Sequence, residues 1–227
     1  MRFVDEYRFG EVKVRLLRDP KVYRPSAATV IIAENLEDVR GKRVLDLGTG
    51  SGVLAIVCAL KGAESVVATD VSRRALRVAE ENLRLNNIKN VELRHGDLYE
   101  ALHPYERFHI IVSNPPMTPS PHNLPRFTWG GPDGRMVLDR VIAGAWNRLE
   151  PHGRLIIPTV SLVGIGRTRG MLEEKGFKVR VLGYTVHPFG ETLLKLINYI
   201  DGLPEADYVY IGGRPCWRLV LFEAAKT

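Results

Sequence analysis

The stretch VLDLGTGSG, residues Val44–Gly52, decides the fold of this chain. Its apolar first half predicts a buried strand that runs directly into three alternating glycines. The apolar residues 53–60 that follow predict a helix. Glycine lets the backbone turn tightly and approach a ligand closely, and the first turn of a helix offers free N–H groups. The stretch therefore predicts a strand, a ligand-binding loop and a helix, in this order.

Two acidic residues follow at the ends of the next two predicted strands. Residues 65–70 read as a short strand that ends in Asp70, about 20 residues past the glycine loop, where an acid commonly binds the hydroxyls of a ribose. Residues 91–96 read as a third strand, and Asp97 follows it. A Gly-x-Gly-x-Gly pattern is weak by itself, but its combination with two acids at strand ends is much more specific.

A further motif, Asn114-Pro115-Pro116-Met117, comes directly after the strongly apolar segment 108–113. Two prolines cannot continue a central strand, because neither can donate a hydrogen bond to its neighbour. The chain must therefore turn at Asn114 and expose a polar side chain and rigid carbonyls at the edge of a sheet. Asn-Pro-Pro alone could be a stiff turn, but the upstream motifs favour a place that holds the N–H groups of a substrate.

Strands and helices alternate along the rest of the chain. This alternation predicts an α/β fold with a mostly parallel sheet that helices cover on both faces. The predicted helices are 26–36, 52–61, 72–86, 135–149 and 162–175, and the predicted strands are 42–47, 65–70, 91–96, 107–113, 154–158, 177–184 and 217–223. An extended or hairpin-like segment is expected before the first helix.

The order of these motifs resembles that of the class I S-adenosylmethionine-dependent methyltransferases, over about residues 42–160. Asn-Pro-Pro after the fourth strand resembles the subset that methylates planar nitrogens, such as glutamine amides, adenine N6 and guanine N2. Residues 130–141 (GGPDGRMVLDRV) and 23–29 resemble segments of the HemK-like glutamine N5-methyltransferases. Met117 departs from that family, which usually has a stacking tyrosine there, and Ala28 falls where the family commonly has an acid. The resemblance implies a doubly wound, Rossmann-like sheet of seven strands.

The resemblance also implies S-adenosylmethionine as cofactor and a set of residues that bind it. The glycines are expected to approach its methionine portion and ribose, Asp70 to hold the ribose hydroxyls, and Asp97 to accept the adenine amine. Asp46 would orient the loop or contact the methionine ammonium, and loop capping is the alternative for Asp46 and Asp97. The expected cofactor-binding residues are Asp46, Gly48, Gly50, Gly52, Asp70, Val71, Asp97 and Leu98. Residues 23–29 would cover the methionine end.

The expected catalytic residues are Asn114, Pro115, Pro116 and Met117. The side-chain oxygen of Asn114 and the carbonyl of Pro115 would accept the two N–H bonds of the acceptor nitrogen and hold it in line with the methyl group. Such preorganised dipoles act where charge develops in the transition state. Met117 would pack against a flat substrate. The chemistry requires no metal, and the histidines are scattered, so no metal site is expected.

Two segments exceed a minimal methyltransferase core. Residues 118–132, with Arg126, Phe127 and Trp129, are expected at the substrate mouth, and the alternative is a rigid wall with buried aromatic side chains. Residues 186–214, with an amphipathic stretch and a tyrosine-bearing strand, are expected to be an insertion that recognises substrate or serves packing or dimerisation. We expect one methyltransferase domain over 1–227, with 1–40 as an N-terminal extension and first helix.

The composition of the chain limits its expected location and its expected partners. The 227 residues are 45% hydrophobic, and no apolar stretch is long enough to span a bilayer. The start lacks the pattern of a signal peptide, so a cytoplasmic location is expected. The chain contains no glutamine and 26% charged residues, which suggests a thermophilic source. The two cysteines suggest buried thiols. The net charge of +6 suits a nucleic acid, and it equally suits a protein substrate presented on the ribosome.

Three functions stay open from the sequence. The first is N-methylation of a protein glutamine, in a translation factor or ribosomal protein, with a small activating protein as a possible requirement. The second is the same chemistry on RNA, at guanine N2 or adenine N6. The third is a dinucleotide-dependent oxidoreductase, because the glycine loop and Asp70 also suit a dinucleotide; Asn114-Pro115-Pro116 and the lack of a hydride-transfer site disfavour it. The sequence does not indicate an oligomeric state.

Overall fold

The structure of the protein is a computed structural model that describes residues 3–227. The strands are β1 Val4–Phe9, β2 Val12–Leu17, β3 Arg43–Leu47, β4 Ser65–Asp70, β5 Val91–His95, β6 Phe108–Ser113, β7 Leu149–Val160, β8 Lys178–Pro188, β9 Val209–Ile211 and β10 Arg214–Ala225. The helices are α1 Ala27–Glu34, α2 Val53–Leu60, α3 Arg73–Leu85, α4 Leu138–Arg148, α5 Ile165–Glu174, α6 Glu191–Lys195 and α7 Ile197–Asp201, with short 3-10 helices η1 Leu98–Ala101 and η2 Ser161–Val163.

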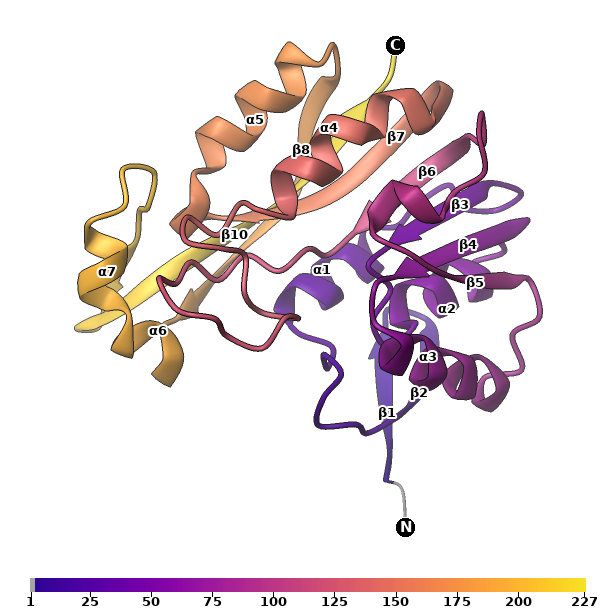
Figure 1. The fold of residues 1–227 in the computed structure, drawn as a ribbon, viewed down its shortest axis with the longest axis horizontal. Coiled ribbons are helices and arrows are strands. Elements are labelled where there is room, and N and C mark those ends of the chain that lie inside the picture. The colour runs from indigo at the N-terminus through magenta and orange to yellow at the C-terminus, as the bar shows by residue number, and fades with distance from the viewer. Residues whose placement is uncertain (1–2) are drawn as a thin grey trace.

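One twisted sheet runs through the molecule in the order β5–β4–β3–β6–β7–β10–β8 (Figure 1). The five strands from β5 to β7 are parallel to one another, and β10 runs antiparallel to both β7 and β8. The short β9 also pairs with β10. The predicted doubly wound, mostly parallel sheet of seven strands is therefore confirmed, with β9 as an addition to it.

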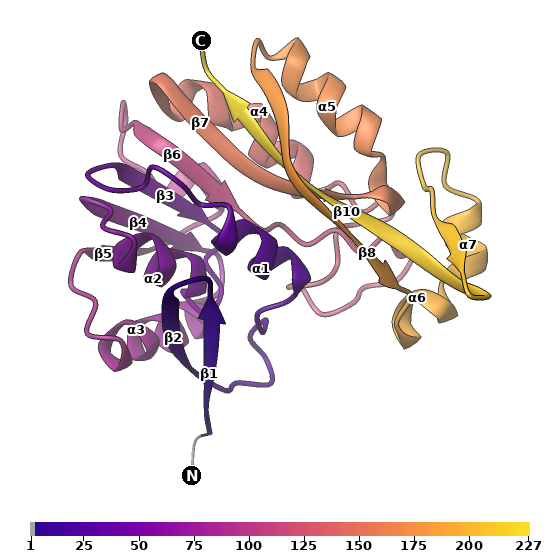
Figure 2. The same cartoon turned by 180° about the vertical axis from the view of Figure 1, so that it is seen from behind.

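Helices cover both faces of this sheet. Figures 1 and 2 show α4 and α5 on one face and α1, α2 and α3 on the other. The sequence of α2, VLAIVCAL, is almost entirely apolar, and its residues 53–58 are buried. This helix needs no polar side because it contacts the sheet, the N-terminal strands and both neighbouring helices.

The N-terminal segment is a two-stranded antiparallel hairpin of β1 and β2. Gly10 makes its turn with a φ of +57°, a conformation that glycine adopts without strain. Asn82 and Asn86 of α3 fasten the hairpin to the domain, since their side-chain oxygens accept the N–H groups of Leu17 and Arg15 at 2.8 and 2.9 Å. The hairpin-like start that the sequence suggested is present.

Several element boundaries differ from the prediction. β7 begins at Leu149, five residues before the predicted strand, because residues 149–153 continue the sheet beside β6 instead of ending the preceding helix. The predicted helix 162–175 is split at Gly164, which has a φ of +81°. β8 extends to Pro188, so the first residues of the predicted insertion 186–214 belong to the sheet. Within residues 3–227, no helix has the length and apolarity to cross a membrane.

Candidate active site

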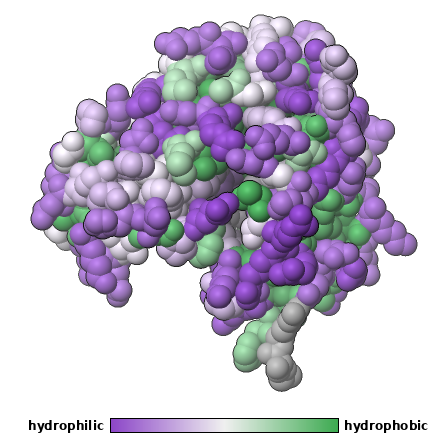
Figure 3. All heavy atoms as spheres, in the orientation of Figure 1, coloured by the Kyte–Doolittle hydropathy of each residue, from purple (hydrophilic) through white to green (hydrophobic). Residues whose placement is uncertain are grey.

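A cavity of about 570 Å³ lies at the carboxyl ends of the parallel strands β3, β4, β5 and β6. Figure 3 shows this face indented between the part that carries the C-terminal strands and the part that carries the N-terminal hairpin. Most of the predicted site residues line the cavity: Gly48, Gly50, Asp70, Val71, Asp97, Leu98, Asn114, Pro115, Pro116, Arg126, Phe127 and Trp129. The structure thus brings together residues from the glycine loop, three strand ends and the loop before α4.

Two glycines give the cavity a wall of bare backbone. Gly48 and Gly50 have φ values of +74° and +57°, which side-chain-bearing residues rarely adopt. A Cβ atom added at either position would meet no atom within 4 Å, so these residues border open space. The N–H groups of Gly48 and Thr49 both donate to the carbonyl of Thr69 at 2.9 Å, which fastens the loop to β4. A ligand can therefore approach the main chain closely here.

The third glycine, Gly52, does not line the cavity, although the sequence placed it in the cofactor site. Its φ is +82°, and a Cβ atom there would lie 3.1 Å from the Cβ of Ala79 in α3. Its carbonyl accepts the N–H of Ile56 at 2.9 Å, at the start of α2. Gly52 therefore allows α2 to pack closely on α3, and we assign it to packing instead of ligand contact.

Asp46 lies beneath the glycine loop and is 1% exposed. Its Oδ2 accepts the hydroxyl of Thr49 at 2.6 Å and the N–H of Ala55 at 3.0 Å. Its Oδ1 has no hydrogen-bond partner among the described residues. Burial raises the pKa of Asp46 to about 7, and the two hydrogen bonds oppose this rise. Asp46 braces the loop from below, as one of its two predicted roles required, but it is not on the cavity wall.

Asp70, the last residue of β4, stands on the wall. Its Oδ2 accepts the N–H of Gly50 at 2.9 Å, and its Oδ1 accepts the N–H of Ser72 at 2.8 Å. Burial raises its pKa, while these two N–H groups and the nearby guanidinium of Arg126 act in the opposite direction. Each carboxylate oxygen has a second lone pair, so Asp70 can support the loop and accept hydroxyl groups of a ligand at the same time.

Asp97 and Leu98 form the wall beyond β5. Leu98 has a φ of +51°, which is unusual for a residue with a side chain. The turn is tight, because a Cβ atom on Gly96 would lie 2.8 Å from the Cβ of Ala101. The Oδ2 of Asp97 accepts a hydrogen bond from Nη2 of Arg140 at 2.9 Å. Arg140 belongs to α4, so this bond joins two different walls of the cavity.

Asn114 follows β6 at the opposite side of the glycine loop. Its Nδ2 donates to the hydroxyl oxygen of Thr29 at 3.3 Å. Thr29 lies in the first turn of α1, is 2% exposed, and also accepts the N–H of Ser26 at 3.2 Å. Within residues 3–227, the Oδ1 of Asn114 has no hydrogen-bond partner. The amide is thus held through its nitrogen, and its oxygen is available to a ligand.

Comparison with known proteins gives the chain a family. The family described as Methyltransferase small domain matches residues 15–182, well over half of the sequence. This chain is a member of that family. It is an S-adenosylmethionine-dependent methyltransferase, as the order of its motifs predicted, and the oxidoreductase alternative does not hold. Relatives of this chain carry names of glutamine methyltransferases, in agreement with the predicted reaction, methylation of a nitrogen.

Two relatives and one solved structure illustrate the similarity. The methyltransferase is 35% identical over 187 residues to a putative protein N5-glutamine methyltransferase of Methanocaldococcus jannaschii, covering 80% of this chain and 93% of that one. It is 30% identical to a release factor glutamine methyltransferase of Rhodopirellula baltica, covering 74% of this chain but 63% of that one, less than two thirds of its length.

The similar solved structure is a Thermus thermophilus 16S rRNA N2 G1207 methyltransferase in complex with S-adenosylmethionine and guanosine. It aligns with 100% of this chain and 51% of that chain, with a TM-score of 0.69 and 24% identity. At this identity the likeness confirms the fold.

Met117 of the methyltransferase is not where the sequence placed it. It is 9% exposed, belongs to the hydrophobic core and does not line the cavity. An added Cβ at Gly134 would lie 2.7 Å from the carbonyl oxygen of Met117, so the backbone of Met117 packs closely against Gly134. The structure thus places Met117 outside the cavity wall, and its contact with a flat substrate stays a prediction.

Aromatic side chains from two other segments border the cavity instead. Tyr23 and Phe127 pack with ring centroids 5.8 Å apart, which joins the lead into α1 to the loop before α4. Trp129 donates its Nε1–H to the carbonyl of Ser120 at 3.1 Å. Phe127 and Trp129 are both half-buried. Their exposure is therefore intermediate between the two alternatives for the loop 118–132, which were a substrate mouth and a rigid wall with buried aromatic side chains.

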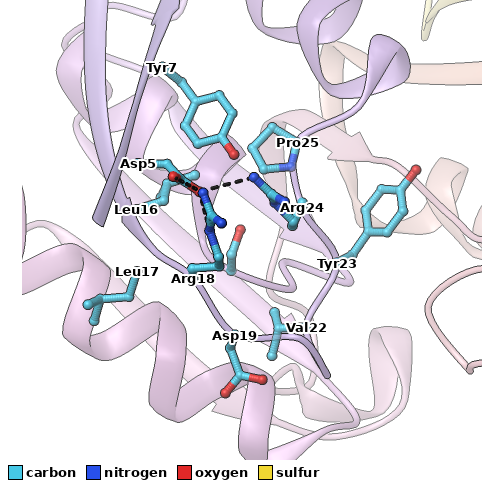
Figure 4. A pocket seen from close by; sticks show the side chains of 11 residues that line it. Asp5, Tyr7, Leu16, Leu17, Arg18, Asp19, Val22, Tyr23, Arg24 and Pro25 are labelled. Atoms are coloured by element: carbon cyan, nitrogen blue, oxygen red, sulfur yellow. Dashed lines mark hydrogen bonds and ion pairs between the residues drawn. The ribbon is translucent and has the colours of Figure 1, made fainter. Parts of the chain in front are cut away.

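The contacts around a small pocket beside Tyr23 hold the segment between β2 and α1 (residues 18–26) in place. Asp5 accepts hydrogen bonds from Arg18 at 2.6 Å and from Arg24 at 3.1 Å. Figure 4 shows Tyr23 on the other side of this segment, away from Asp5 and Arg18. The hydrogen bond from Arg18 is the main reason that the pKa of Asp5 is lowered. The hairpin thereby carries Tyr23 to the cavity.

Arg135 anchors the loop before α4, and sequence reasoning gave it no role. It is 1% exposed, and its guanidinium donates to Asp139 at 2.6 Å, to the hydroxyl of Thr168 at 3.0 Å and to the carbonyl of Val163 at a short distance. The loop is also closed by an isolated bridge between Thr118 and Trp129. Arg135 lies in the stretch 130–141 that carried the resemblance, but nothing in that stretch signals its burial, because arginines are usually exposed.

Arg140 and Lys21 were also missed, although both line the cavity. Arg140 lies in the stretch 130–141 that carried the resemblance, which was the available signal for it. The predicted insertion contributes no residue to the cavity wall, but Tyr199 of α7 donates to the carbonyl of Pro132 at 3.0 Å and so touches the end of the loop 118–132. In the described part of the chain, no three histidine, cysteine, aspartate or glutamate residues are grouped as metal ligands would be.

Proposed function

We propose that this methyltransferase transfers the methyl group to the side-chain amide nitrogen of a glutamine in a protein of translation. The observation that carries the proposal is the arrangement of Asn114: Thr29 holds its nitrogen at 3.3 Å, and its oxygen is left free beside Pro115 and Pro116 on the cavity wall. An amide –NH2 is a planar group with two donors, and a fixed carbonyl oxygen is its natural partner.

The cofactor is assigned to the opposite wall. Gly48 and Gly50 let the main chain approach its methionine portion and ribose, and Asp70 accepts the ribose hydroxyls. Asp97 and Leu98 hold the adenine. The bare backbone of Gly48 and Gly50 supports the fit, since an added Cβ at either position would meet no atom within 4 Å and a ligand has room against the main chain. When bound, S-adenosylmethionine supplies an electrophilic methyl group on a sulfonium sulfur.

The wall formed by Asn114, Pro115 and Pro116, here called the acceptor wall, acts on the nitrogen of the glutamine amide. Its lone pair is delocalised into the amide, so it attacks poorly unless the charge that develops on it is stabilised. The Oδ1 of Asn114 and the carbonyl of Pro115 accept its N–H bonds, which orients the lone pair toward the methyl carbon and stabilises that charge. The C–N bond forms as the C–S bond breaks, and the nitrogen then loses one proton to solvent.

A protein acceptor is supported by the relative from Methanocaldococcus jannaschii, which is a putative protein N5-glutamine methyltransferase and is matched over 93% of its length. The release factor glutamine methyltransferases and a ribosomal protein L11 methyltransferase among the relatives point to translation proteins as the class of acceptor. A cytoplasmic location is part of the same proposal, because translation takes place there.

One observation favours a second candidate, methylation of an exocyclic amine in RNA. The cavity wall carries Lys21, Arg24, Arg126 and Arg140, and aromatic rings stand beside them. Cations and stacking rings are what a single-stranded nucleic acid requires. Two of these arginines are already paired, Arg24 with Asp5 and Arg140 with Asp97, which leaves less free charge than the count suggests.

The test is transfer of a tritiated methyl group from S-adenosylmethionine into ribosomal proteins, release factors and total RNA, with Asn114→Ala beside the wild type. Label in protein, at glutamine N5 by mass spectrometry and reduced about 100-fold in the variant, supports the proposal. Label in RNA shifts the assignment to the second candidate. Label in neither, with S-adenosylhomocysteine bound normally, supports a requirement for a small activating protein. Full turnover by Asn114→Ala would remove Asn114 from the mechanism.

A further inference from the structure

Asp97 and Arg140 form a contact that the proposed reaction does not by itself require. Asp97 follows β5, on the side of the cavity assigned to the adenine, and Arg140 extends from the first turn of α4. Nη2 of Arg140 lies 2.9 Å from Oδ2 of Asp97. Both side chains are about half exposed, at 48% and 41%. The contact therefore crosses the rim of the cavity in open contact with solvent.

An ion pair this exposed contributes little to folding. Exposed pairs are typically worth well under 1 kcal/mol, because water screens them and two side chains must be held in one geometry. The pair differs from other exposed pairs on the helices in that both of its residues line the cavity. Arg84 with Glu80 and Arg169 with Glu173 join residues within a single helix. Arg74 with Asp19 and Arg167 with Asp133 join distant residues, as Arg140 and Asp97 do, but they lie outside the cavity wall.

The geometry of Asp97 leaves one carboxylate oxygen available. Arg140 uses Oδ2, and Oδ1 has no partner in the described part of the chain. The backbone beneath is fixed, because Gly96 has no room for a Cβ and Leu98 is held at a φ of +51°. The torsion of the side chain is then the remaining freedom of the carboxylate, and a charge-assisted hydrogen bond from Arg140 restricts it.

We propose that Arg140 is a positioning residue that orients Asp97, so that Oδ1 accepts the exocyclic amine of the adenine and discriminates against rings without that donor. This inference rests on the proposed function, since it assumes that Asp97 faces the adenine of S-adenosylmethionine. In a ring that carries oxygen in place of the amine, a hydrogen-bond acceptor would face the acceptor Oδ1 of Asp97. Because Arg140 keeps the carboxylate in this orientation, such a ring would bind more weakly.

The test uses calorimetric binding of two ligands, S-adenosylhomocysteine and S-inosylhomocysteine, which differ by this amine. The wild type is expected to prefer the adenosyl ligand, and Arg140→Met to reduce the preference about fivefold, the effect of losing one well-placed hydrogen bond. Arg140→Lys keeps one charged donor and should recover part of the preference. Arg169→Met, which removes a comparable exposed pair on α5, should leave it unchanged. Melting midpoints should stay close to that of the wild type.

The outcomes separate this inference from the function it rests on. If the wild type fails to bind S-adenosylhomocysteine, the proposed function fails and the inference fails with it. If binding is normal but Arg140→Met keeps the wild-type preference, or weakens both ligands equally, Arg140 does not act by orienting Asp97 and the inference alone is overturned. An Asp97→Asn variant that keeps the full preference would show that the adenine amine is held elsewhere, which also overturns it.

Discussion

The Nδ2 of Asn114 lies 3.3 Å from the hydroxyl oxygen of Thr29, although the two residues are 85 positions apart in the chain. This contact joins the first turn of α1 to the end of β6. The hydroxyl oxygen of Thr29 also accepts the N–H of Ser26, so it is fixed by the start of its own helix. The orientation of the Asn114 amide is therefore set by α1, which lies outside the motif that contains Asn114.

Replacement of Thr29 by valine should lower kcat about 2- to 10-fold and leave the Kd for S-adenosylhomocysteine nearly unchanged. Valine keeps the shape of this buried side chain but removes the oxygen that holds Nδ2, so the amide can rotate. Thr29→Ser keeps the oxygen and should retain most of the activity. The measurement is steady-state kinetics together with calorimetric binding. A loss of kcat in both variants would indicate that packing, and not the hydroxyl, is responsible.

Replacement of Asp70 by asparagine should weaken binding of S-adenosylhomocysteine about 10- to 100-fold. Both carboxylate oxygens already accept backbone N–H groups, from Gly50 and Ser72. The amide –NH2 of asparagine must face one of these donors or the ribose, so at least one charged hydrogen bond is lost. Glu64→Gln removes an exposed carboxylate next to the other end of β4 and serves as the control. Equal binding by all three proteins would exclude Asp70 from the ligand site.

Sequence patterns correctly placed on the cavity wall those site residues that lie at the ends of strands. Asp70, Asp97 and Asn114 each lie at or just after the end of a predicted strand, and parallel strands necessarily bring such ends to one edge. Val71 and Leu98, which directly follow Asp70 and Asp97 in the chain, also line the cavity. In these cases a local signal fixed the position of the residue. The doubly wound sheet of seven strands was implied by the family resemblance.

The predictions that failed depended on how loops pack, which has no local signal. Met117 follows the Asn-Pro-Pro turn, yet it is 9% exposed and belongs to the hydrophobic core, with its carbonyl packed against Gly134. Gly52 repeats the spacing of the other glycines, but it contacts Ala79 of a helix 27 positions later. Arg135 and Arg140 contact residues far away in the chain, Thr168 and Asp97, and the resemblance of residues 130–141 gave neither arginine a role.

Asp46 should make the stability of the protein depend on pH between about 4 and about 7. Burial raises the pKa of Asp46 from an ordinary 3.8 to about 7 in the folded state, so the folded chain binds a proton that the unfolded chain has lost. Its contribution to the free energy of unfolding is complete below about pH 4 and is lost as the pH rises through about 7. Asp46→Asn removes this titration.

The stability of Asp46→Asn relative to the wild type should therefore increase from about pH 4 to about pH 7 and be constant above that. Urea denaturation of both proteins at a series of pH values measures this difference. Thr49→Val, which removes one hydrogen bond to Asp46 without removing the carboxylate, should keep the pH dependence. A difference between Asp46→Asn and the wild type that does not change with pH would contradict the raised pKa.

Replacement of Gly134 by alanine should destabilise the protein by about 2 kcal/mol or more. Gly134 has a φ of +77°, and an added Cβ would lie 2.5 Å from Cγ1 of Val163 and 2.7 Å from the carbonyl of Met117. Because Met117 is three residues after Asn114, relief of this clash should also displace the acceptor wall and lower kcat. Gly170→Ala is the matched control, since its Cβ meets nothing within 4 Å inside α5 and alanine favours the helix by about 0.5–1 kcal/mol. Urea denaturation should therefore show a lower free energy of unfolding for Gly134→Ala and a higher one for Gly170→Ala. Steady-state kinetics should show a loss of activity for Gly134→Ala alone. An unchanged kcat in a folded Gly134→Ala would show that the acceptor wall does not depend on this packing.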